Sequence, residues 1–424
     1  MSYPLLPSVS LMEAASTFAS DLIGTQSDLQ AFLQVYLKGG INPYNGSNFP
    51  GFFTLTNAKL YGGDWSVVWG PCVYARDSVG TATNAMYVAF SPSQNTYVVC
   101  IAGTNPLSSF DWIYEDFDIF PNYAAHWPPK LPFVPFWRVN LIPPTTPALS
   151  AATAMGISDL LTQAQMRDPI LGSLAQFLKT KTAANATLIF AGHSLAGALA
   201  PALALYLYPT PQSSGWKNIF VLSLAGATPG NYGFALAFAA AFPETVDSTG
   251  DWSWNIDYAN NYDVVPHAWD KLLQVVQDED NAGNFPSIWG VLQGPGLDTV
   301  GYAVSSAMDV GTFLGEFYYY PIPQSWVTPS WGYFSGQTWS PLPTYTDASP
   351  LSTWKELAAV IVATHTDQYF NYFGVEPPPP IYKPELKTVS PEAAVLGKLR
   401  VTRPRRRTGG PRAVLSGRRT PVTG

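Results

Sequence analysis

The sequence is poor in cysteine, histidine and charge. Its 424 residues include two cysteines and four histidines, which excludes a disulfide-stabilised scaffold and a cysteine-based zinc module. Charged residues make up 12% of the chain, whereas apolar residues make up 47% and aromatic residues 14%. This composition excludes an intrinsically disordered protein, a coiled coil and a collagen-like fibre. The length is ample for a sizeable core, and any catalytic imidazole must be one of four.

Positive charge is scarce in most of the chain and concentrated at one end. Residues 1–382 hold 11 basic and 27 acidic residues, a net charge of −16, whereas residues 383–424 hold 11 and 2, a net charge of +9. A body this acidic repels nucleic acid, so we expect no nucleic-acid partner for it. The basic tail is expected to act as a solubilising segment, with binding to anionic lipid or nucleic acid as alternatives.

The sequence also lacks a recognisable export signal or membrane span. Its first residues contain no basic segment followed by a long apolar core, so no standard signal peptide is expected. The uncharged run 188–209 has the length of a membrane span, but it contains His193, Ser194 and Pro201. It fits a buried strand followed by a buried helix better. We therefore expect a soluble protein, cytoplasmic rather than exported by a route without a signal peptide.

Strand and helix patterns alternate in the middle of the chain. Strand patterns at 188–191 and 219–224 are each followed by a helix pattern, at 195–208 and 232–242. This order is typical of a mainly parallel sheet covered by helices on both faces, which predicts an α/β fold. The other expected strands are 66–75, 85–90, 96–101 and 254–258, and the other expected helices are 11–22, 27–37 with Ser27 as N-cap, 149–161, 171–180 and 354–365.

The remaining segments define the expected domain organisation. We predict one domain over residues 1–375, with an irregular, proline-rich lid region at about 105–147 and an aromatic-rich insertion at about 272–350. Residues 376–424 are proline-rich and then basic, which predicts a disordered tail. The aromatic insertion either lines a groove for acyl groups or packs over the sheet edge.

A serine occupies the predicted junction between strand 188–191 and the next helix. Residues 192–197 read Gly-His-Ser-Leu-Ala-Gly, and a serine in such a turn projects its hydroxyl above the carboxyl edge of the sheet. The N–H of Leu195, at the helix N-terminus, can donate to a developing oxyanion. Ala196 stands where the pattern Gly-x-Ser-x-Gly has its last glycine. Taken alone, the motif fits a nucleophile at Ser194 and a plain tight turn equally well.

A nucleophilic serine needs a general base and a carboxylate that orients it. In α/β-hydrolases the chain order is serine, acid, histidine, and only His267 and His365 follow Ser194. We favour His365, because His267 lies four residues from the best acid on the same loop and fits a core histidine better. The favoured acid is Asp263, just after strand 254–258, and its rival Asp257 lies within that strand.

A second oxyanion donor is expected after an earlier strand. Residues 97–101 run into Ala102-Gly103-Thr104, where Thr104 offers both an N–H and a hydroxyl. The alternative is that Gly103 and Thr104 simply end the strand in a turn.

Through these residues the chain resembles the class 3 (fungal-type) lipases of the α/β-hydrolase superfamily. The likeness runs in order through five blocks: Thr96–Thr104 with Asp111, Trp112 and Asp116, then Gly192–Ala200, Leu224–Asn231, Asn261–Pro266 and His365–Phe370. The resemblance implies a triad of Ser194, Asp263 and His365, with Thr104 at the oxyanion position. The chain departs from the family at Ala102, where an arginine is usual, at Ala196, and in the long span between Asp263 and His365.

The resemblance also implies an amphipathic lid directly after the oxyanion strand. Here residues 107–120 interleave apolar and acidic side chains, and the expected substrate contacts are Phe110, Trp112, Ile113 and Phe117. We expect this segment either to close over Ser194 in water and open at a lipid interface, or to be an ordinary packed element.

Together these features predict a serine carboxylic-ester hydrolase, specifically a triacylglycerol or acylglycerol lipase. Its partners are a lipid or other ester substrate and, transiently, the lipid–water interface, and the chemistry needs no metal or organic cofactor. Phospholipase A1 and feruloyl-type esterase activity are alternatives within the enzyme class. A non-catalytic lipid-binding relative that keeps the fold is the alternative outside it.

Overall fold

The fold is described by a computed structural model of the chain. It describes residues 5–17, 22–103, 124–133, 142–182, 185–267, 319–336, 338–343 and 352–379, all within one compact unit, Met1–Leu386. Thr104, the segment 107–120, much of the aromatic insertion and nearly all of the tail lie outside these residues.

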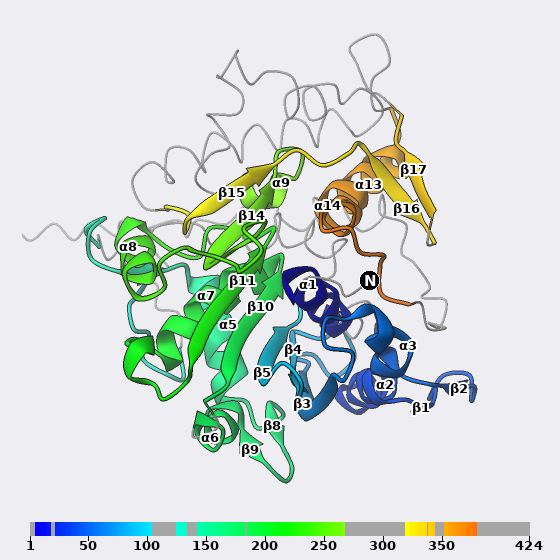
Figure 1. The fold of residues 1–424 in the computed structure, drawn as a ribbon, viewed down its shortest axis with the longest axis horizontal. Helices are drawn as coiled ribbons and strands as arrows, with labels where there is room; N and C mark the ends of the chain where they lie inside the picture. The colour runs from blue at the N-terminus through cyan, green and yellow to red at the C-terminus, as the bar shows by residue number, and fades with distance from the viewer. Residues whose placement is uncertain are drawn as a thin grey trace, which may run out of the picture. The chain divides into compact units, whose positions relative to one another are not determined.

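A seven-stranded mixed sheet forms the centre of this unit (Figure 1). Its spatial order is β15 (Gln324–Val327), β14 (Ile256–Asn260), β11 (Asn218–Leu224), β10 (Thr187–His193), β5 (Thr96–Ile101), β4 (Asn84–Ser91) and β3 (Ser66–Tyr74). The strands from β5 to β15 are parallel, and β4 and β3 are added antiparallel. From β10 to α8 (Tyr232–Ala241), strands alternate with helices in sequence, as the pattern predicted.

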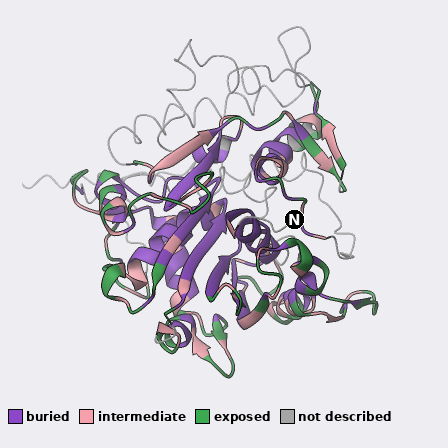
Figure 2. Ribbon diagram, viewed as in Figure 1, coloured by how far each residue is buried: buried purple, intermediate pink, exposed green. Residues whose placement is uncertain are grey.

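Helices cover both faces of the sheet. One face packs against α1 (Leu5–Ser16), α2 (Gln26–Lys38), α3 (Phe52–Thr56) and α14 (Gln368–Tyr372), and the other against α5 (Ala151–Thr162), α6 (Leu174–Lys179), α7 (Leu195–Leu207) and α8 (Tyr232–Ala241). In β10, Leu188 and Phe190 enter the core beside α7, whereas Ile189 and Ala191 enter the core beside α1. This alternation explains why the strand is apolar throughout and why the central strands are buried in Figure 2.

The smaller elements lie around this frame. They are α9 (Val264–His267), α13 (Trp354–Val362), β1 (Gly40–Ile41), β2 (Asn48–Phe49), β6 (Ala125–His126), β7 (Ala148–Leu149), β8 (Arg167–Asp168), β9 (Gly172–Ser173), β12 (Thr245–Val246), β13 (Ser253–Trp254), β16 (Gly332–Ser335), β17 (Thr338–Pro341) and the 3₁₀ turns η2 (Asn57–Lys59) and η5 (Pro211–Ser213). None of the helices within the described ranges is long and apolar enough to cross a membrane.

Two predicted helix starts were wrong. The first helix begins at Leu5 instead of residue 11, because residues 6–16 are all buried and no single apolar stripe marks it. The second helix is capped by Thr25 and not by Ser27. Thr25 accepts from the N–H of Asp28, whose carboxylate accepts from the N–H of Thr25, so both residues form a capping box.

The aromatic insertion contributes to the sheet itself. Its residues Gln324–Val327 form β15, which pairs parallel with β14 at the sheet edge. Part of the segment therefore extends the sheet instead of only covering it. The sequence did not reveal this strand, because its four residues carry no alternating pattern of sufficient length.

The final helix does not end at His365, as the sequence suggested. The helix α13 passes into a π-helical turn at Ala363–Asp367, labelled η6, and then into α14. A π-helical turn inside a helix is rare and is found mostly at functional sites. His365 therefore lies at the centre of a continuous helical segment.

Candidate active site

Ser194 occupies a sharp turn between β10 and α7. Its φ and ψ are 62° and −128°, a conformation that non-glycine residues seldom adopt. The Ser194 N–H donates to the carbonyl of Leu224 at 2.9 Å, and this bond anchors the turn to the end of β11. The serine is therefore held by the sheet in the strained geometry typical of a nucleophile elbow.

The small residues around Ser194 allow strand and helix to approach closely. A Cβ placed on Gly192 would lie 2.3 Å from the carbonyl oxygen of Ala196, and one placed on Gly197 would lie 2.7 Å from the Cα of Gly226. The close contacts therefore require glycine at 192 and 197. Ala196 is buried and fits because its neighbour on β10 is a glycine: a Cβ placed on Gly192 would lie 2.7 Å from the Cβ of Ala196.

Asp263 and His365 form a buried hydrogen-bonded pair. The Nδ1 of His365 lies 2.7 Å from the Oδ2 of Asp263, and the two residues are 1% and 0% exposed. The second carboxylate oxygen of Asp263 accepts from the N–H of Val265 at 3.0 Å. The bond orients the imidazole so that its Nε2 points away from the carboxylate.

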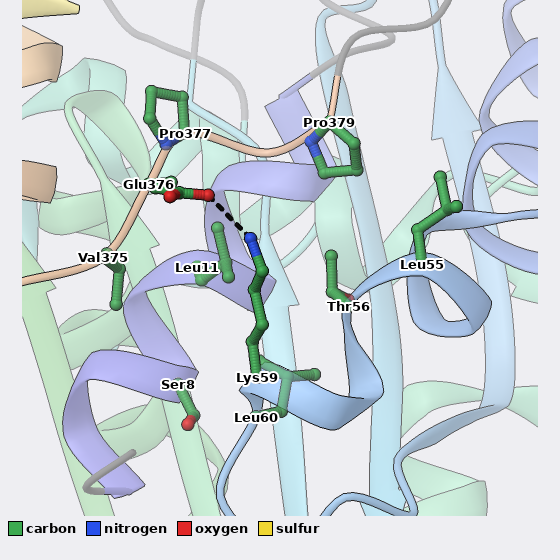
Figure 3. A pocket seen from close by; sticks show the side chains of 10 residues that line it. All are labelled: Ser8, Leu11, Leu55, Thr56, Lys59, Leu60, Val375, Glu376, Pro377 and Pro379. Carbon is green, nitrogen blue, oxygen red and sulfur yellow. Dashed lines mark hydrogen bonds and ion pairs between the residues drawn. The ribbon is translucent and has the colours of Figure 1, made fainter. Parts of the chain in front are cut away.

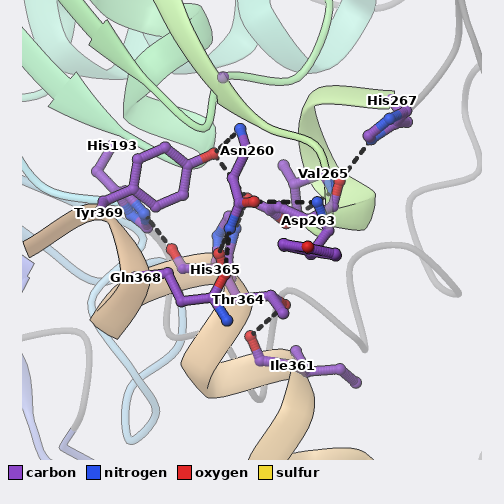
Figure 4. A network of polar contacts seen from close by, with 12 residues as sticks. His193, Asn260, Asp263, Val265, His267, Ile361, Thr364, His365, Gln368 and Tyr369 are labelled. Atoms are coloured by element: carbon purple, nitrogen blue, oxygen red, sulfur yellow. Dashed lines mark hydrogen bonds and ion pairs between the residues drawn. The ribbon is translucent and has the colours of Figure 1, made fainter. Parts of the chain in front are cut away.

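Two further residues hold this pair in place (Figure 4). The hydroxyl of Tyr369 donates to the Oδ2 of Asp263 at 3.1 Å and accepts from the N–H of Asn260 at 2.8 Å. The side-chain amide of Asn260 donates to the carbonyl of Thr364 at 2.7 Å and to Gln368 at 2.9 Å. No role at the site was predicted for Tyr369 or Asn260 from the sequence. Tyr369 was detectable in principle, because it follows His365 by four positions on a helix.

The second ring nitrogen of His365 is buried close to the elbow. Its Nε2 has no hydrogen-bond partner among the described residues. The rings of His365 and His193 lie 4.6 Å apart, and His193 immediately precedes Ser194. The structure thus joins Asp263 to His365 directly and brings His365 to the elbow, without a hydrogen bond to Ser194.

The two rival residues have other partners. The Nδ1 of His267 lies 2.6 Å from the backbone carbonyl oxygen of Asp263, and its ring is 4.5 Å from that of Trp326. Asp257 is buried in β14 and accepts from Ser223 at 2.6 Å. Burial raises the pKa of Asp257 to about 7, although its hydrogen bonds lower it. His267 therefore contacts the Asp263 main chain instead of its carboxylate.

The expected oxyanion donors are described only in part. Leu195 is the first residue of the 13-residue helix α7, so its N–H lies at the positive end of the helix dipole. Thr104 and the expected lid residues Phe110, Trp112, Ile113 and Phe117 lie outside the described residues. A Cβ placed on Gly103 would lie 3.4 Å from the Cβ of Ser194, so the end of β5 abuts the serine.

A separate cavity of about 240 Å³ lies between α1, η2 and the segment after α14 (Figure 3). Its walls include Leu11, Leu60 and Val375, and the ion pair Lys59–Glu376 lies at 2.6 Å across it. Both charged side chains are about half exposed, so the pair contributes little to stability. Neither Ser194, Asp263, His365 nor Leu195 lines this cavity.

The sheet and the elbow define an α/β-hydrolase fold, and this fold resembles one of the solved structures that match. M37 lipase is 20% identical over 86% of this chain and 90% of its own, with a TM-score of 0.54. Rhizomucor miehei lipase in a propeptide complex is 17% identical over 48% and 52%, and Rhizopus niveus lipase II 17% over 49% and 62%, both with a TM-score of 0.33. The likeness to M37 lipase confirms the predicted fold.

The part of the chain that holds the elbow and Asp263 matches a known protein family. The family model described as lipase (class 3) matches residues 98–272. The resemblance to class 3 lipases is thereby confirmed over this region. No curated protein matches the sequence. The family match and the fold together support a lipase-type ester hydrolase.

Proposed function

We propose that the protein is a serine carboxylic-ester hydrolase that acts on acylglycerols through an acyl-enzyme at Ser194. The observation that carries this proposal is the buried bond between Asp263 and His365, whose ring lies 4.6 Å from that of His193, the residue before Ser194. A hydroxyl in a strained turn, an oriented imidazole and a buried carboxylate are the three groups that ester hydrolysis requires.

The reaction proceeds in two halves. Ser194 Oγ attacks the ester carbonyl carbon and its proton passes to the Nε2 of His365, which then gives the proton to the departing alcohol oxygen. Water next attacks the acyl carbon and its proton passes to the same Nε2, which then returns the proton to Ser194 Oγ as the Oγ–acyl bond breaks and the acid is released. Asp263 keeps the Nδ1–H tautomer and stabilises the imidazolium.

The negative oxygen of the tetrahedral intermediate needs donors near Ser194. The N–H of Leu195 at the start of α7 is the proposed first donor, and Thr104 is the proposed second donor. The proposed role of Thr104 is supported by the preceding residue, Gly103, because a Cβ placed on Gly103 would lie 3.4 Å from the Cβ of Ser194. Each such donor typically contributes about 3–4 kcal/mol to transition-state stabilisation.

An apolar acyl chain is the proposed substrate feature, and phospholipase A1 and feruloyl-type activity are the alternatives. The lid proposal rests on the sequence alone, because residues 107–120 lie outside the described residues. It is tested with a soluble short-chain ester across the concentration at which droplets form. A jump in rate supports interfacial opening, and a smooth hyperbola contradicts it.

A fluorophosphonate probe tests the proposed nucleophile. The wild-type protein is expected to be labelled and Ser194→Ala is not. Ser10→Ala is the matched control, because Ser10 is a buried serine bonded within its own helix, and it is expected to be labelled fully. Absence of labelling in all three proteins would support a non-catalytic relative. Hydrolysis rates over esters of increasing acyl length, phospholipids and feruloyl esters then identify the substrate class.

A further inference from the structure

The π-helical turn that carries His365 is held by side chains from two strands. The carbonyl of His365 accepts from the Nε2 of His193 at 2.5 Å, and the carbonyl of Thr364 accepts from Asn260 at 2.7 Å. Both acceptors belong to the turn Ala363–Asp367. A π-helical turn interrupts the regular bonding of a helix, and buried carbonyls require partners. The turn is therefore anchored from outside its own helix.

The anchoring residues adjoin the other two members of the proposed triad. His193 directly precedes Ser194 at the end of β10, and Asn260 lies three residues before Asp263 at the end of β14. The His193 contact spans 172 positions in sequence and is completely buried. The backbone that orients the serine hydroxyl thus also positions the ring that holds His365.

The surroundings of His193 keep its ring neutral. Burial lowers its pKa well below the usual value, and the nearby His365 lowers it further. A neutral ring that donates from Nε2 has its proton on that nitrogen. A carbonyl cannot donate, so the bond to His365 specifies the tautomer of His193 with the proton on Nε2.

We propose that His193 is a positioning residue, whose Nε2–H holds the carbonyl of His365 and thereby sets the distance between His365 and Ser194. The inference rests on the proposed function, because it assigns both residues their catalytic roles. It predicts an effect on turnover larger than the effect on folding, since a displacement of about 1 Å in a catalytic group can cost 100-fold in rate.

The test compares two substitutions of His193 with p-nitrophenyl butyrate as substrate. His193→Phe keeps a ring but removes the donor, and kcat is expected to fall about 100-fold with KM changed less than about twofold. His193→Gln places an amide donor near the position of Nε2 and is expected to retain about a tenth of wild-type kcat or more. If the Phe variant does not fold, His193→Met replaces it, because methionine is flexible and has no donor.

Tyr87→Phe is the matched control. Tyr87 is a buried ring on β4 whose hydroxyl donates to the carbonyl of Met12 at 2.6 Å, away from the site. Its loss is expected to lower Tm without a fall in kcat. Wild-type kcat in His193→Phe, or equal impairment of the Phe and Gln variants, would overturn the proposal.

Hydrogen exchange separates this inference from the proposed function. In His193→Phe the peptide amides of residues 363–372 are expected to exchange faster than in the wild type, with no change in β3 and β4. Unchanged exchange at 363–372 overturns the proposed anchor. If wild-type hydrolysis does not depend on Ser194, the proposed function fails, whereas faster exchange still demonstrates that His193 holds the turn.

Discussion

The Nδ1 of His365 and the Oδ2 of Asp263 lie 2.7 Å apart, although 102 positions separate the two residues. Asp263 follows β14, and His365 lies in the π-helical turn between α13 and α14. The hydroxyl of Tyr369 donates to the same carboxylate oxygen, so this oxygen accepts two hydrogen bonds in a buried environment. The pair is therefore fixed in one orientation, which is what a general base requires.

Replacing the two downstream histidines should separate their roles. His365→Ala removes the proposed general base and is expected to lower kcat by about 10⁴-fold or more, with a small change in KM. His267→Ala is expected to retain activity within about tenfold, because the ring contacts the carbonyl of Asp263 and not its carboxylate. Steady-state hydrolysis of a soluble ester measures both. A severe loss in His267→Ala with activity kept in His365→Ala would reverse the assignment.

Removing the hydroxyl of Tyr369 should affect stability and turnover together. Tyr369→Phe leaves the N–H of Asn260 without its buried partner, which is expected to cost about 1–3 kcal/mol of unfolding free energy. It also removes one donor from Asp263, so kcat is expected to fall about tenfold through a less well-oriented His365. Urea unfolding and steady-state kinetics measure the two effects. A variant with wild-type kcat would show that Asp263 is held sufficiently by its other bonds.

Substitutions at the small residues Ala196 and Gly197 should lower stability to different extents. Ala196→Gly is expected to cost about 1 kcal/mol, the usual difference between these residues in a helix, and to keep activity. Gly197→Ala places a Cβ 2.7 Å from the Cα of Gly226 and 2.8 Å from the carbonyl oxygen of Leu224. Because both neighbours are backbone atoms, we expect a loss of about 2–3 kcal/mol and reduced labelling of Ser194.

Thermal unfolding and fluorophosphonate labelling measure this pair of substitutions. The prediction is contradicted if Gly197→Ala is as stable as the wild type, since that would require α7 to move away from β11 at no cost. Equal losses in the two variants would also contradict it.

The buried carboxylate of Asp257 should make stability depend on pH. Its pKa is raised to about 7 by burial, whereas an unfolded aspartate has a pKa of about 4. Between these values the folded protein binds more protons than the unfolded chain, so its stability decreases as pH rises from about 4 to 7. The stability that protonated Asp257 contributes to the fold is fully present below about pH 4 and is lost as the pH rises through the pKa of the folded protein.

Asp257→Asn should remove this dependence without breaking the network. The carboxylate oxygen that accepts from Ser223 and Gly226 corresponds to the amide oxygen of asparagine. The new amide can donate to the Oε1 of Gln324, which has no partner among the described residues, once that side chain is flipped. The wild type is expected to lose up to about 1.4 kcal/mol per pH unit relative to the variant between pH 5 and 7. Urea unfolding of both proteins at pH 5 and pH 7 measures this difference. The prediction is contradicted if the unfolding free energy changes equally with pH in the wild type and in Asp257→Asn.

Local patterns predicted the central part of the fold well. The apolar strand before Ser194, the helix after it and the next strand–helix pair were predicted within about three residues of β10, α7, β11 and α8. These elements are long, and their patterns come from burial on both faces of the sheet. Prediction failed for segments whose pattern is short or uniform, such as β15, which was missed, and α1, whose start was misplaced.

The sequence alone determined the order of the serine, the acid and the histidine, because chain order is read directly from it. It also determined the small residues that a tight elbow needs, because these are neighbours along the chain. Only the tertiary structure decided that the carboxylate of Asp263 faces His365, that His267 contacts a carbonyl instead, and that Tyr369 and His193 hold the pair. Hydrogen bonds form only within about 3 Å and in a narrow range of angles. Such geometry arises when distant strands and helices pack together, and no local pattern encodes it.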